Sequence, residues 1–142
     1  MRRVLTRADL ERDPHAVWNT FIEIIATGDP AELTTLQQQA QLVFDYDSGV
    51  YNGGHGQYLE NMGLAHAVKT VDALAVFGLG AQARVLAGVV ELLQVRGGAW
   101  AEVLEDGVIE ELDDAFHACV PTVHEAFEQH LVRHSGEHIE FA

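Results

Sequence analysis

Apolar residues recur at helical spacing along most of the chain, and this periodicity constrains the fold more than any other sequence feature. It is clearest in residues 33–44, 64–77 and 81–95, where apolar side chains lie at positions i, i+3 and i+4. No segment shows the period-two alternation that is typical of a half-buried strand. We therefore predict an all-α fold, a compact single-domain bundle of about seven or eight helices.

Turn residues divide the predicted helices. Asp45 to Gly49 is rich in turn formers, and Asn52-Gly53-Gly54 predicts a break in the backbone. Gly97-Gly98 is expected to end segment 81–95, which is apolar nearly all round and is predicted to be the central core helix.

The same spacing predicts which side chains face inward. On segment 64–77 these include Val68, Leu74 and Ala75, and on the last helix they include Leu131 and Val132.

The length of 142 residues suggests one domain that buries a core without a covalent staple. Cys119 is the single cysteine, which excludes an intramolecular disulfide and fits a reducing compartment. Neither a signal peptide nor an apolar run of membrane-spanning length is evident, so we expect a cytoplasmic protein.

Charge is distributed unevenly. Four arginines lie in residues 1–12, which we predict to be a basic N-terminal arm or short helix. Residues 13–142 are predicted to form a single all-helical acidic domain, with 20 acidic against four basic residues and hence a net charge of −16. Phosphate would be repelled by this surface, so direct binding to nucleic acid is not expected.

Between Gly97 and Val132 the chain contains no lysine or arginine. An acidic stretch of this kind could bind the basic surface of another protein, or it could be a solvated surface that maintains solubility. The predicted partner-binding acids are Glu102, Glu105, Asp106, Glu110, Glu111, Asp113 and Asp114.

The segment around Asn52 combines conformational freedom with polar side chains. Gly53 and Gly54 permit positive φ or close backbone approach. Gln57 and Asn61 are four residues apart on one helical face, and Tyr58 carries a hydroxyl that needs a partner when buried. The segment could be a polar clasp or a surface for self-association or partner contact. It has no lysine and follows no strand, which argues against a phosphate-binding loop.

Three histidines, His130, His134 and His138, are spaced four apart near the C-terminus. They would share a face of a continuous helix and could then bind zinc or nickel. Gly136, however, is expected to end the helix and remove His138 from that face. Cys119 is interpreted as core filling. We therefore expect no metal, cofactor or catalytic residue, and no enzymatic activity.

The residues Asn52, Gly53, Gly54, Gln57, Tyr58 and Asn61 resemble the core motif of an all-helical bacterial family of largely unknown function. The best-understood type in that family is a dimeric DNA-mimic protein that binds a transcriptional repressor. The resemblance extends from about Leu33 to Leu131, and it departs from the usual pattern at His55, where the family often has a large apolar residue.

The resemblance implies a non-enzymatic acidic protein that sequesters a DNA-binding protein such as a repressor. It also implies that the protein could form a homodimer. Duplex DNA as long as the domain, about 37 Å, carries about 22 phosphate charges. The charge of −16 on residues 13–142 is of the same order. An immunity-type inhibitor of a toxin or nuclease is the alternative, and a metal-binding or hydrolytic protein is a third hypothesis.

Overall fold

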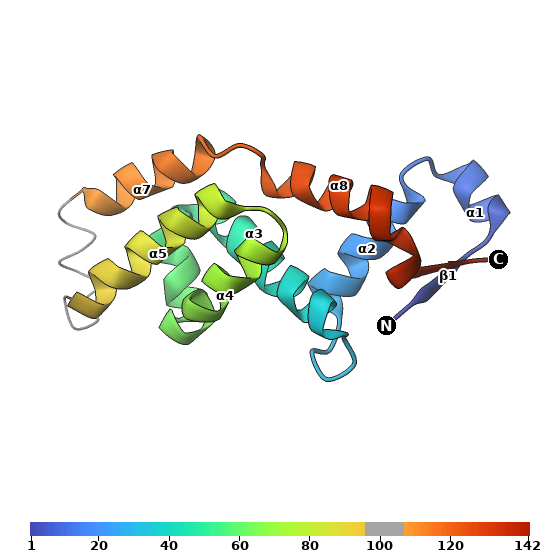
Figure 1. The fold of residues 1–142 in the computed structure, drawn as a ribbon, viewed down its shortest axis with the longest axis horizontal. Helices are drawn as coiled ribbons and strands as arrows, with labels where there is room; N and C mark the ends of the chain where they lie inside the picture. The colour runs from blue at the N-terminus through green and yellow to red at the C-terminus, as the bar shows by residue number, and fades with distance from the viewer. Residues whose placement is uncertain (96–106) are drawn as a thin grey trace.

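The computed structural model describes residues 1–95 and 107–142 (Figure 1). In chain order the elements are β1 (Arg3–Leu5), α1 (Arg7–Arg12), α2 (Ala16–Thr27), α3 (Thr35–Met62), α4 (Leu64–Val76), α5 (Gly80–Val95), α7 (Val108–His117), α8 (Val123–His134), the 3-10 helix η1 (Ser135–Glu137) and β2 (Ile139–Phe141).

Helices account for nearly all of the regular structure in these ranges, which confirms the predicted all-α class. The longest of them, α3, packs against α2, α4, α7 and α8, whereas α5 packs mainly against α4 and α7. The prediction that segment 81–95 is the central helix is therefore wrong, because α3 occupies the centre (Figure 1). Across the described ranges, none of the helices is both long and apolar enough to cross a membrane.

Aromatic side chains from three helices form much of the core. Phe21 of α2 meets Phe127 of α8 edge to face at 5.4 Å, and Tyr46 meets Tyr58 within α3 at 5.0 Å. All four side chains are almost completely buried. Burial of each such ring is worth about 1.5–3 kcal/mol, so these contacts stabilise the packing of α2 on α8 and the core-facing side of α3.

Two details of the helix prediction need correction. Asp45 to Gly49 is helical rather than a turn, because the burial of Tyr46 and Val50 holds this part of α3 in the core. On α4 the buried face includes Ala67 and Leu74, and Val68 is exposed.

The predicted inward position of Ala75 is also wrong, since this residue is exposed. Val132 is 86% exposed, while its neighbour Leu131 is buried. Ala75 and Val132 therefore lie just outside the buried faces of their helices.

The two ends of the chain form a small parallel sheet that the sequence did not predict. Arg3 of β1 aligns with Ile139 of β2, and the register continues to Leu5 and Phe141. Each strand has three residues, too few to show a periodic signal. The sheet lies at the opposite end of the molecule from α7 (Figure 1).

Candidate interaction site at the α3 kink

The predicted break at Asn52-Gly53-Gly54 is confirmed as a kink inside α3. Gly53 has φ −164° and ψ 19°, and Gly54 has φ 77° and ψ −178°. A side chain at Gly54 would be strained by this positive φ and would also contact Asp113, since an added Cβ would lie 2.5 Å from its Oδ2. A Cβ at Gly53 would collide with the side chain of Gln57. Both glycines are therefore required by the local geometry.

The residue after the kink, His55, connects α3 to α7. Its backbone N–H and its Nδ1 both lie within hydrogen-bonding distance of Asp113 Oδ1, at 2.8 and 2.6 Å. A carboxylate accepts, so Nδ1 carries the proton and Nε2 accepts from the hydroxyl of Tyr46 at 2.7 Å. The resulting chain from Tyr46 through His55 to Asp113 fixes the ring tautomer.

Burial controls the ionisation of these groups. His55 and Tyr46 are inaccessible to solvent. Desolvation lowers the pKa of His55, against the opposing effect of the Asp113 hydrogen bond and charge. Desolvation also raises the pKa of Tyr46 far above its usual range. His55 is therefore neutral and structural near pH 7.

The motif residues divide into a buried and an exposed group. Tyr58 is buried, and its hydroxyl lies 2.7 Å from His66 Nδ1. Burial raises the pKa of Tyr58 to about 12. Asn52, Gln57 and Asn61 are exposed. The tyrosine thus belongs to the scaffold, whereas the three amides are presented to solvent.

The exposed part of the motif shares a groove with the acidic helix α7. The lining residues are Gly53, Gly56, Gln57, Glu60 and Asn61 from α3, and Ile109, Glu110 and Asp113 from α7. The groove is therefore lined mainly by amide and carboxylate groups, and Ile109 is its one apolar side chain among the described residues. Such a surface can bind donors such as lysine, arginine or backbone N–H groups.

The predicted acidic residues have different positions. Glu110, Glu111 and Asp114 are exposed on α7, while the side chain of Asp113 is 24% exposed and bonded to His55. Glu102, Glu105 and Asp106 lie outside the described residues. The described part of the predicted acidic surface is therefore a helix face with three exposed carboxylates.

An exposed aromatic residue that the sequence analysis did not select lies at the C-terminal end of α7. Tyr51 is 62% exposed and contacts the His117 ring at a centroid distance of 4.9 Å. Tyr51 precedes the kink on α3, and His117 ends α7. Exposed tyrosine is typical of binding surfaces. The only local sequence signal for Tyr51 was that it precedes the motif residue Asn52.

Comparison with known families supports the resemblance noted in the sequence. Residues 31–134 match the family model described as DMP19-like protein. This span is close to the expected Leu33 to Leu131. Neither the curated proteins nor the solved structures contain a match.

Proposed function

Because the chain belongs to the DMP19-like protein family, a family of DNA-mimic type, we propose that it is a non-enzymatic interaction protein that presents carboxylates to the basic surface of a DNA-binding protein. The proposed partner is a cytoplasmic protein such as a transcriptional repressor. The proposed contact surface consists of the α3–α7 groove and the exposed acids Glu110, Glu111 and Asp114.

The observation that carries this proposal is the shared groove. Gln57 and Asn61 line the same hollow as Glu60 and Glu110, although the two helices are far apart in the sequence. The kink lets α7 approach α3 closely enough for Asp113 to bond to His55.

Electrostatics favours a basic partner. The whole chain carries a net charge of −14, and residues 97–132 contain no lysine or arginine. Such a field increases the rate of encounter with cationic surfaces and repels nucleic acid. A homodimer, which would double the charge, is part of the proposal.

The test is affinity capture from host lysate with duplex DNA as competitor. The bait is the wild-type protein or the triple variant Glu110→Gln, Glu111→Gln and Asp114→Asn. A matched control removes three exposed acids elsewhere in the chain, with Glu32→Gln, Asp72→Asn and Glu140→Gln. We expect the wild type and the control to retain a partner that the triple variant loses.

The identity of the captured protein and its competition with DNA distinguish the two classes of partner. A DNA-binding protein that is released by duplex DNA supports mimicry, because DNA and the acidic face would then occupy one site. A captured toxin or nuclease favours the immunity-type alternative, and a partner that duplex DNA does not displace would argue against mimicry. Equal retention by all three baits would show that the α7 acids are not the contact surface.

A further inference from the structure

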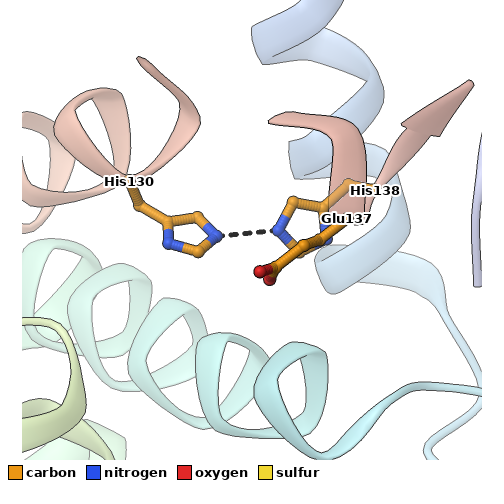
Figure 2. A group of neighbouring side chains, drawn as sticks. All are labelled: His130, Glu137 and His138. Carbon is orange, nitrogen blue, oxygen red and sulfur yellow. Dashed lines mark hydrogen bonds between the residues drawn. The ribbon is translucent and has the colours of Figure 1, made fainter. Parts of the chain in front are cut away.

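The C-terminal histidines come together in a way that the helical spacing did not predict. Helix α8 ends at His134, two residues before the predicted stop at Gly136, and His138 leaves its face as expected. The 3-10 turn Ser135–Glu137 then reverses the chain and returns His138 to His130, so that their Nε2 atoms are 2.8 Å apart (Figure 2). Glu137 lies beside them, and the nearest ligand atoms of the three residues are all within 4.8 Å of one another.

We propose that His130, Glu137 and His138 form a zinc-binding site, with Nε2 of each histidine and one carboxylate oxygen as ligands and water in the fourth position. Two imidazoles and one carboxylate are a donor set that suits Zn²⁺. Zinc–nitrogen bonds of about 2.0–2.1 Å in a tetrahedral site place the two nitrogens about 3.3 Å apart. The two Nε2 atoms must therefore separate by about half an ångström, and the rings must turn so that both lone pairs point at the ion.

The surroundings support ligands that are uncharged and held in place. His138 is 1% exposed and packs against Phe21, with ring centroids 4.8 Å apart. Desolvation lowers the pKa of His138 to about 4 and also lowers the pKa of His130. Glu137 is exposed, which gives the cation a route from solvent.

The hydrogen bond from Gln37 sets which ring nitrogen of His138 carries the proton before zinc binds. Its Nε2 donates to His138 Nδ1 at 3.0 Å, so the neutral ring carries its proton on Nε2 and shares it with His130. Zinc replaces that proton, which moves to Nδ1. The Gln37 amide must then turn over so that Oε1 accepts from Nδ1. This breaks the bonds that Oε1 accepts from the N–H groups of Thr34 and Met1 and the bond that Nε2 donates to the Met1 carbonyl. Zinc binding is therefore opposed by the capping of α3.

This coupling suggests a variant that should gain affinity. In Gln37→Glu a carboxylate accepts from Nδ1–H of His138 without an amide rotation. A carboxylate behind a zinc-bound histidine orients the ring and raises its basicity, and such outer groups typically change metal affinity 10- to 100-fold.

The experiment is calorimetric titration of untagged, chelator-treated protein with zinc chloride at neutral pH. We compare the wild type with His130→Ala, Glu137→Gln and Gln37→Glu. The matched control is His124→Ala, which removes a surface histidine that bonds to Glu128 at 2.7 Å. Far-UV circular dichroism and Tm verify that each variant folds. His130 is only half-buried, so His130→Ala tests the site with less risk to the core than His138→Ala.

One zinc per chain in the wild type, at least tenfold weaker binding in His130→Ala and Glu137→Gln, and unchanged binding in His124→Ala would support the site. Tighter binding in Gln37→Glu would confirm Nε2 of His138 as the ligand atom, and its absence would contradict that assignment. No binding by the wild type, or an equal loss in His124→Ala, would overturn the proposal. None of these results depends on the proposed interaction with a DNA-binding protein.

Discussion

Asp113 Oδ1 accepts two hydrogen bonds from His55, one from the backbone N–H at 2.8 Å and one from Nδ1 at 2.6 Å. One carboxylate oxygen of α7 therefore satisfies both the backbone and the ring of the residue that follows the α3 kink. Because Glu110, Glu111 and Asp114 are on the same short helix, this contact also sets the orientation of the exposed acidic face.

Asp113→Ala should lower the free energy of unfolding by about 2–4 kcal/mol, because it leaves two donors of His55 without an acceptor in a buried site. Denaturant unfolding followed by circular dichroism measures this loss. Asp114→Ala on the exposed side of α7 is the control and should change stability by no more than about 0.5 kcal/mol. Equal effects of the two substitutions would mean that the His55 contact does not stabilise the fold.

Gly54→Ala and Gly63→Ala form a matched pair for the kink. Both glycines have positive φ, 77° and 84°, with extended ψ, so alanine is strained at either position. An added Cβ at Gly63 meets nothing within 4 Å, whereas at Gly54 it meets Asp113. We expect each variant to lose about 1–3 kcal/mol, and Gly54→Ala to lose at least about 1 kcal/mol more.

Thermal unfolding of the two variants under identical conditions gives this difference. If Gly63→Ala is as destabilising as Gly54→Ala, close approach of α7 is not the reason for glycine at the kink. The comparison separates backbone strain from side-chain contact, since the strain is common to both positions.

The sequence was sufficient to predict most of the helices and the kink, because both arise from local signals. Apolar spacing identified α4 and α5 almost to their ends, and two adjacent glycines predicted the break in α3. Local signals also misled: Asp45, Asp47 and Ser48 are common in turns, but the burial of Tyr46 keeps this segment helical. Tertiary packing outweighed the turn preference there.

The contacts that build the candidate sites could not be predicted, because they join distant residues. His55 and Asp113 are 58 positions apart, and Gln37 and His138 are 101 apart. The spacing of apolar residues along the sequence contains no information about such a pairing. His138 was correctly expected to leave the face of α8, but a three-residue 3-10 turn brings it back to His130. The aligned register of β1 and β2 likewise depends on how the chain ends meet.

Asp47→Asn should stabilise the protein at neutral pH. Burial raises the pKa of Asp47 to about 6, with His117 and His124 acting in the opposite direction. Because the pKa is higher in the folded than in the unfolded state, the charged carboxylate lowers the free energy of unfolding, and this destabilisation is complete above about pH 6. As the pH falls below about 6 the folded carboxyl takes up a proton and the destabilisation decreases. It is absent below the unfolded pKa of about 3.9.

Tm measured from pH 4 to pH 8 checks this prediction. The variant should melt higher than the wild type at pH 7.5, and the difference should shrink toward zero at pH 4. Asp72→Asn on the exposed side of α4 controls for the loss of one negative charge. An Asp47→Asn protein that is less stable than the wild type at pH 7.5 would show that the carboxylate has a stabilising partner.

Salt dependence should separate the charged and apolar parts of the proposed interface, once a partner is captured. Electrostatic attraction between exposed charges is screened as NaCl rises from about 50 to about 500 mM, whereas apolar burial is not weakened. The wild-type Kd should therefore rise steeply with salt. The triple variant Glu110→Gln, Glu111→Gln and Asp114→Asn should bind weakly at low salt, and its Kd should depend less steeply on salt concentration.

Tyr51→Ala should weaken binding at every salt concentration and keep the wild-type slope of Kd against salt, since Tyr51 offers an exposed ring and no charge. If the triple variant keeps the wild-type slope, the α7 carboxylates do not face the cationic groups of the partner, and the complex depends on another surface.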